Sequence, residues 1–252
     1  MTLYGELQRA DWLRLKSLEP ADVPDVLILH GEWGLAGALE RWRSAFAGEV
    51  CDTEWNALLG THAGVDVMVA GVFGSPMAAF VAHPLCQMGT QLVVQTGYFG
   101  GLSPTVDYGD VLLVTHADCH DGVAPSYVSC PPDGYAAEPG LLARMRRICT
   151  RKELPFAQGK VISTDAVLTE DLAKIRRWQE RGFVGVDMET ATTFSVAHAY
   201  GSQAVAILNL SDHLDRGDSF FEYTDERRQL EANTDMAIRD VILEFIEESF
   251  SS

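Results

Sequence analysis

Short apolar runs alternate with segments of helical spacing along most of the chain, and this alternation constrains its fold more than any other feature. Runs that are almost continuously apolar are typical of strands buried on both faces of a sheet. Helices that separate such strands cover the two faces of the sheet. We therefore predict an α/β fold with a central mixed, mostly parallel sheet flanked by helices. It forms a single domain over residues 1–252, with a polar lead-in at 1–24.

The individual elements follow from the apolar runs and from the turn residues between them. The predicted strands are 25–31, 65–72, 91–95, 110–115, 158–163, 183–187 and 203–210. The predicted helices are 35–46, 77–88, 141–152, 170–181, 189–200 and 225–248. Residues 49–64 fit either a short strand or a loop, and the proline-rich segment 120–139 is predicted to be an irregular loop.

The acidic composition excludes several classes of partner. The formal net charge is −17, so the chain lacks the basic face that binding to nucleic acid or to an anionic membrane requires. No apolar run is long enough to span a bilayer, and the N-terminus lacks the pattern of a signal peptide. The five cysteines form no C-x-x-C pair, and their odd number fits a reduced protein. We expect a cytoplasmic protein that binds neither nucleic acid nor membrane.

The stretch 182–192 (G-F-V-G-V-D-M-E-T-A-T) places two carboxylates at the junction between a buried strand and a helix. Ligands bind at the carboxyl ends of parallel strands, so Asp187 and Glu189 are candidates for a binding site. Alternatively, they cap and charge the first turn of the helix. The glycine cluster 97–101 and the Ser-Asp-His sequence 211–213 are expected to reach the same place, and the three stretches together favour a functional site.

Other polar groups offer further candidates, each with a structural alternative. Asp212 ends a buried strand, where burial raises the pKa of a carboxyl group and allows it to donate a proton, but it also fits a turn. The turn 71–76 (G-V-F-G-S-P) lacks the Walker and Rossmann patterns, so its amides either hold an anion or only pack a helix onto a strand. His116, Asp118 and His120 would share one face of a strand. Such a lone cluster fits polar strand ends better than a metal site, and we predict no metal.

Three motifs together resemble one family. V-D-M-E-T-A at 186–191 resembles the V-E-M-E-x-A signature of the nucleoside phosphorylase superfamily, and L-S-D-H at 210–213 resembles the V-S-D-H of its trimer-of-dimers purine enzymes. T-G-Y-F-G-G-L at 96–102, with P-x-x-x-x-G-D-V at 104–111, is similar to the corresponding segments of methylthioadenosine nucleosidases. The resemblance extends over roughly residues 25–245 and implies a three-layer sandwich.

The resemblance implies cleavage of the N-glycosidic bond of a nucleoside through an oxocarbenium-like transition state. Glu189 would hold the ribose hydroxyls, and Met188 would pack on the sugar. Asp212 would protonate the departing base, assisted by Arg228 or its neighbour Arg227. The remaining substrate-binding residues that the resemblance implies are Gly97, Tyr98, Phe99 and, at the position that stacks on the base, Val167.

The phosphate side departs from the family pattern. Phosphorylases of this kind carry G-D-P-x-R after the first strand, whereas this chain has G-E-W-G-L at 31–35 and so lacks the arginine. The arginine of R-x-G-[ST] falls on Gln95, and its hydroxyl residue falls on Tyr98. His30, Gly31 and Gln95 are what remains to hold phosphate or another nucleophile. Glu32 is the nearest match to the glutamate with which the nucleosidases activate water.

The sequence thus predicts phosphorolysis of a nucleoside, with purines favoured, to give the free base and a pentose 1-phosphate. Inorganic phosphate would be a co-substrate, and no cofactor or metal is required. Two alternatives stay open: hydrolysis by water, because the phosphate-binding arginines are missing, and nucleoside binding without turnover. The resemblance also implies a homo-oligomer, either a dimer or a trimer of dimers, because relatives complete the site with residues of a neighbouring subunit.

Overall fold

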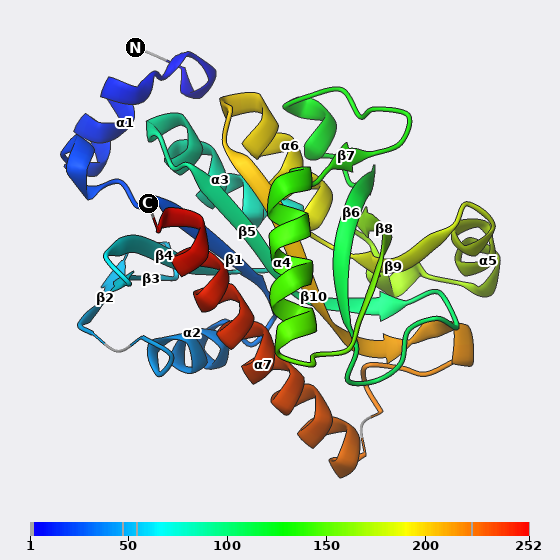
Figure 1. Ribbon diagram of the computed structural model, residues 1–252. Coiled ribbons are helices and arrows are strands. Elements are labelled where there is room, and N and C mark those ends of the chain that lie inside the picture. The colour runs from blue at the N-terminus through cyan, green and yellow to red at the C-terminus, as the bar shows by residue number, and fades with distance from the viewer. Residues whose placement is uncertain (1–2, 47, 54, 223, 252) are drawn as a thin grey trace.

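The apolar runs of the chain pair into one large mixed sheet in the computed structural model (Figure 1). The structure describes residues 3–46, 48–53, 55–222 and 224–251. Within these residues the strands are β1 (Val26–Gly31), β2 (Val50–Thr53), β3 (Ala57–His62), β4 (Val65–Val72), β5 (Leu92–Gly101), β6 (Val111–His120), β7 (Tyr135–Ala136), β8 (Phe156–Thr164), β9 (Phe183–Asp187) and β10 (Gln203–His213). The α-helices are α1 (Arg9–Lys16), α2 (Leu35–Arg43), α3 (Ser75–Met88), α4 (Pro139–Arg151), α5 (Leu172–Glu180), α6 (Thr190–Tyr200) and α7 (Asp225–Phe250).

The strand order is β10-β6-β8-β9-β5-β1-β4-β3-β2, and β7 pairs with β6 outside this path. Strands β5, β1 and β4 are parallel, and the β3–β2 hairpin continues the sheet antiparallel at one edge. An additional parallel pairing between β10 and β5 closes β5, β9, β8, β6 and β10 into a ring. Closure removes free strand edges from the part of the sheet that carries the predicted site.

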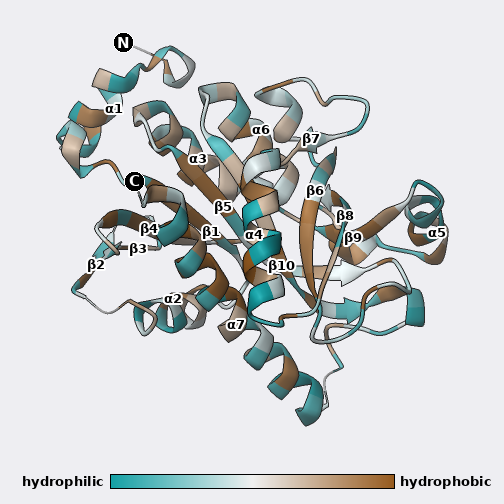
Figure 2. Cartoon of the chain, viewed as in Figure 1, coloured by the Kyte–Doolittle hydropathy of each residue, from teal (hydrophilic) through white to brown (hydrophobic). Residues whose placement is uncertain are grey.

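Two hydrophobic cores lie on the two faces of the sheet, as the brown strands at the centre of Figure 2 indicate. Helices α3 and α6 cover one face, where Phe194 is fully buried. Helices α2, α4 and α7 cover the other face, where Trp42 and Phe245 are fully buried. This three-layer arrangement confirms the predicted α/β fold with a central mixed sheet. No helix among the described residues has both the length and the apolar character needed to cross a membrane.

Several element boundaries differ from the prediction. Within the segment 49–64, which fitted either a short strand or a loop, β2 (Val50–Thr53) and β3 (Ala57–His62) pair as an antiparallel hairpin. The strand predicted at 91–95 continues as β5 through the glycine cluster to Gly101. Glycine is needed there for close approach, because a Cβ added at Gly97 would lie 2.4 Å from the backbone oxygen of Gly31 on the adjacent strand, and Gly97 has a φ of +133°. The predicted loop 120–139 contains a short 3-10 helix and β7.

Strand β10 contains a bulge just before its polar end. Leu210 pairs with Phe99, and Asp212 pairs with Gly100. Phe99 and Gly100 are consecutive in β5, so Ser211 is an extra residue in β10 between these two pairs. Side chains alternate between the faces of a regular strand, so Leu210 and Asp212, two residues apart, would share a face if β10 had no bulge. The bulge instead places Asp212 on the face that carries Tyr98 of β5.

Candidate active site

A cavity of about 410 Å³ opens at the carboxyl ends of β1, β5, β9 and β10. The three polar stretches that the sequence singled out meet there, as expected for ligand sites in open α/β sheets. The cavity is lined by Gly31, Glu32, Trp33, Phe73, Tyr98, Phe99, Gly100, Val167, Glu170, Val186, Asp187, Met188, Glu189, Ser211, Asp212, Leu214, Phe220, Arg228 and Glu231.

Glu189 and Met188 lie where β9 passes into α6. The backbone N–H of Gly74 donates a hydrogen bond of 2.7 Å to Glu189 Oε1. Glu189 is only 5% exposed; burial, with a smaller contribution from the charge of Asp187, raises its pKa to about 8. The Ser75 hydroxyl donates to the Met188 carbonyl at 2.8 Å and so fixes this turn against the start of α3. A held carboxyl group of this kind suits hydrogen bonding to sugar hydroxyls.

Both carboxylate oxygens of Asp187 accept hydrogen bonds from neighbouring polar groups. The Ser163 hydroxyl donates to one carboxylate oxygen, and the backbone N–H and hydroxyl of Thr190 donate to the other. Burial raises its pKa, although these hydrogen bonds oppose the shift. The residue therefore fastens the first turn of α6 to β8, which is the structural alternative considered from the sequence.

Asp212 also lines the cavity and is 3% exposed. Burial raises the pKa of Asp212, while a hydrogen bond from Ser211 and the positive charge of Arg227 lower it. Arg227 donates through Nε to the carbonyl of Ser211 at 3.1 Å and lies over the ring of Tyr108. Arg228 lines the cavity itself. The two arginines that the sequence left unresolved thus differ in place: Arg227 supports the backbone beside the acid, and Arg228 is part of the cavity wall.

Eight of the predicted site residues line the cavity: Gly31, Tyr98, Phe99, Val167, Met188, Glu189, Asp212 and Arg228. Three do not. Gln95 is fully buried on the other face of β5, where its amide accepts from Thr193 and donates to the Thr96 carbonyl. Gly97 packs against the backbone of Gly31. His30 lies behind the cavity wall, 1% exposed, as part of a polar network.

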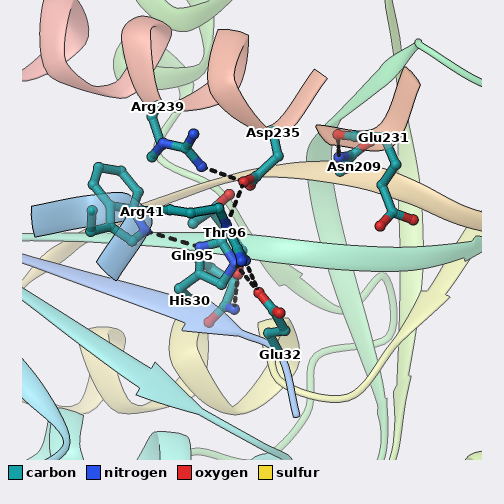
Figure 3. A network of polar contacts seen from close by, with 10 residues as sticks. His30, Glu32, Arg41, Gln95, Thr96, Asn209, Glu231, Asp235 and Arg239 are labelled. Atoms are coloured by element: carbon teal, nitrogen blue, oxygen red, sulfur yellow. Dashed lines mark hydrogen bonds and ion pairs between the residues drawn. The ribbon is translucent and has the colours of Figure 1, made fainter. Parts of the chain in front are cut away.

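This network connects β1, α2 and α7 (Figure 3). The indole N–H of Trp42 donates to His30 Nδ1 at 3.0 Å, so His30 Nε2 carries the proton and faces Glu32 at 3.3 Å. Arg41 pairs with Glu32 and with Asp235, which also pairs with Arg239. Burial alone would raise the pKa of Glu32, but the nearby imidazole of His30 and the charge of Arg41 outweigh burial, and the pKa is lowered. Glu32 is therefore an ionised carboxylate at the cavity wall.

Three aromatic side chains at the cavity, those of Trp33, Phe73 and Phe220, were not predicted from the sequence. Trp33 stacks on Phe73 with ring centroids 6.2 Å apart and meets Phe220 edge-on at 5.4 Å. All three rings line the cavity, and Trp33 is 60% exposed. They come from three separate loops, so no local pattern reveals them. The G-E-W-G turn, in which a tryptophan occupies a position next to the first strand, was the one available signal.

The His116, Asp118 and His120 cluster is not brought together as a metal site. Arg181 pairs with Asp118, and the ring of His120 lies near Trp178. Among the described residues, the side chains spaced for a metal are instead Asp118, Cys119 and Cys130. Burial raises the pKa of the Cys119 thiol to about 12, so the thiol is protonated in the absence of a metal.

We compared the chain with known proteins and protein families. A family model described as the phosphorylase superfamily matches residues 43–246. The chain belongs to the phosphorylase superfamily. It is 26% identical over 223 residues to "Purine nucleoside phosphorylase DeoD-type 2" of Vibrio parahaemolyticus, and this alignment covers 87% of this chain and 93% of the relative. It is 23% identical over 235 residues to "Guanosine phosphorylase" of Halorubrum lacusprofundi, which covers 88% of this chain and 93% of the relative.

The fold of this superfamily member matches solved structures as well. A uridine phosphorylase from Vibrio fischeri superposes with a TM-score of 0.78 at 19% identity, covering 93% of this chain and 99% of that chain. The superfamily membership inferred from the motifs is thereby confirmed, as is the fold. At this identity the structural match concerns the fold, and the chemistry has to be argued from the cavity.

Proposed function

We propose that this protein cleaves the N-glycosidic bond of a nucleoside, with a purine as the preferred base. The observation that carries the proposal is the position of two buried carboxyl groups in one cavity. Glu189 would bind the ribose hydroxyls, and Asp212 would protonate the departing base. Because burial raises the pKa of Asp212, the acid keeps its proton to higher pH and is suited to general acid catalysis. Arg228 would stabilise charge that develops as the base departs.

Phosphate is the first candidate for the nucleophile. The relatives reported above bear the names of phosphorylases, and the chain matches them over most of its length. Gly31, at the end of β1, forms part of the cavity wall on the side where the family motif holds phosphate. Purine preference is proposed from the names of the same relatives. On this proposal the products are the free base and a pentose 1-phosphate, and the reaction needs neither a metal nor an organic cofactor.

Water is the second candidate, and Glu32 is the observation that favours it. Its carboxylate lines the cavity in ionised form, held by His30 and Arg41. A second acidic residue, Glu231, lines the cavity as well. Two carboxylates repel a phosphate anion, whereas an ionised carboxylate can orient and deprotonate water.

An assay of base release separates these possibilities. Adenosine, guanosine, inosine, uridine and methylthioadenosine are each incubated with the protein, with and without inorganic phosphate, and the free base is measured by chromatography. Base release that requires phosphate supports phosphorolysis, and equal release without phosphate supports hydrolysis. If no nucleoside is cleaved while one still raises the melting temperature, the protein binds nucleosides without turnover and the proposal is wrong.

We also propose that the protein is a cytoplasmic homo-oligomer. Exposed aromatic rings surround the mouth of the cavity, with Trp33 at 60%, Phe73 at 45% and Phe221 at 66% exposure. Clustered apolar side chains of this kind are typical of protein interfaces. Light scattering after size exclusion measures the mass directly, and a mass of one 27.6 kDa chain would contradict an oligomer.

A further inference from the structure

Glu170 lines the cavity from a short connection that no motif marks. It follows the 3-10 helix η4 (Val167–Thr169), and its backbone N–H donates to the carbonyl of Val167 at 3.1 Å. Val167, which the family pattern places against the base, lines the same cavity. Glu170 therefore lies at the end of the cavity where the base would bind, together with Asp212.

One carboxylate oxygen of Glu170 lacks a hydrogen-bond partner. Oε1 is buried, and none of the described residues donates to it. Most buried polar atoms in folded proteins are hydrogen-bonded, and a buried carboxylate oxygen without a donor costs free energy. Because Glu170 lines the cavity, this oxygen is an unfilled acceptor at the cavity wall. Its natural complement is a donor on the ligand.

The charge state of the neighbouring groups defines which ligand fits. Burial and the carboxyl group of Asp212, opposed by the charge of Lys174, raise the pKa of Glu170 to about 7. Two carboxyl groups that face one space do not ionise independently, so one tends to keep its proton while the other is ionised. The pair presents one donor and one acceptor. A purine has the complementary set, with a lone pair on N7 and an N–H on its six-membered ring.

We propose, building on the nucleoside cleavage proposed above, that Glu170 accepts a hydrogen bond from an N–H of the six-membered ring of a purine base. With the shared proton on Asp212, this residue would face N7, and Glu170 would face the amino group at C6 or the N–H at N1. Adenosine, guanosine and inosine each offer such an N–H, and purine riboside offers none. The structure thus assigns selectivity for N–H-bearing purine nucleosides to a residue outside the family motifs.

The experiment compares kcat/KM for adenosine, guanosine, inosine, uridine and purine riboside in the wild type and in two variants. Glu170→Leu removes the acceptor, and Glu170→Gln keeps a neutral one. Glu180→Gln is the matched control, because it removes the same charge at the exposed end of α5. We expect Glu170→Leu to lower kcat/KM for the preferred N–H-bearing purine nucleoside roughly 10- to 100-fold. Purine riboside should change less than about threefold, and Glu170→Gln should lie between.

Comparing each substrate with itself across the variants removes the intrinsic difference in bond strength between the nucleosides. The assignment would be overturned if Glu170→Leu lowered kcat/KM equally for purine riboside and for the N–H-bearing substrates. It would also be overturned if the variant lowered kcat/KM for none of them. Cleavage of uridine alone would overturn the base class. If Glu170→Leu does not fold, the ratios of the nearly isosteric Glu170→Gln variant decide in the same way.

Failure of the proposed function is a separate outcome. If the wild type releases no base from any of the five nucleosides, cleavage is wrong, and dissociation constants measured by calorimetry for the same set then test Glu170. Weaker binding of only the N–H-bearing purine nucleosides in Glu170→Leu supports the role of the residue. Absence of binding by all five nucleosides overturns both proposals.

Discussion

Replacement of Asp212 with asparagine separates proton donation from substrate binding. The side chain is 3% exposed and its neighbours are the Ser211 hydroxyl and the charge of Arg227, so the nearly isosteric amide fits the same space. Asparagine can still form hydrogen bonds, but it cannot transfer a proton to the base. Because general acid catalysis contributes about 10²–10⁴-fold, we expect kcat for inosine to fall by that factor. This corresponds to about 3–5 kcal/mol of transition-state stabilisation.

The substrate provides an internal control. In 7-methylguanosine the base already carries a positive charge at N7 and leaves without protonation, so the variant should cleave it within about tenfold of the wild-type rate. Rates are measured by chromatography of the released base, and dissociation constants by calorimetry should stay nearly unchanged. Equal losses on the two substrates would refute proton donation by Asp212, and so would full activity of the variant on inosine.

The pH dependence of the same reaction follows from the raised pKa of Asp212. An acid catalyst must be protonated, so kcat of the wild type should fall as the pH rises through this pKa. The variant has no proton to lose, and its residual rate should lack this decline. The melting temperature of the variant should not decrease, because burial disfavours the ionised carboxylate that the substitution removes. A strongly lowered melting temperature would mean that the loss of activity reflects misfolding.

Four further predictions address the remaining parts of the site. Arg228→Ala should lower kcat/KM without lowering the melting temperature, whereas Arg227→Ala should lower both, because Arg227 holds the backbone beside the acid; identical effects would remove the distinction. Gly97→Ala should destabilise the protein by more than about 2 kcal/mol in urea unfolding, since its Cβ would lie 2.4 Å from the Gly31 oxygen; an unchanged midpoint contradicts this. The pKa of Glu189 is raised from 4.5 to about 8, so its contribution to stability is complete below pH 4.5 and is lost as the pH rises through 8. The melting temperature of the wild type should therefore fall over this range, and Glu189→Gln should make the fall smaller. Dialysis against EDTA should leave base release unchanged, and a loss restored by a divalent cation would show that a metal is required.

The layered fold could be predicted from the sequence because most of the strands are buried on both faces. Such strands are continuous apolar runs and need no knowledge of tertiary contacts. The β2–β3 hairpin was less evident, because Gly60 interrupts the apolar character of β3 and the turn from β3 to β4 begins with Ala63, which has a positive φ of 50°, and not with a glycine. The extension of β5 was missed for a related reason. Its glycines resemble a turn, but they serve the close approach of β5 to β1.

The candidate site was predictable only where its residues belong to local motifs. Met188, Glu189 and Asp212 fall within continuous signatures, and all three line the cavity. Gln95 was assigned by counting three residues back from Tyr98, yet residues three apart on a strand face opposite sides. Glu170 lies outside every signature and joins the cavity only through the closed ring of strands. Its position therefore depends on tertiary structure.

The bulge in β10 has a consequence for how such a site can be lost in evolution. A strand of the same length that paired Ser211 with Gly100 would keep its aspartate, its glutamate and all of its motif letters. Its side chains would alternate regularly, and Asp212 would face the apolar core beside Leu210. Activity can thus disappear through a shift of register that alters no functional residue. Counting matched letters across relatives would not detect that loss, whereas the register between β10 and β5 would.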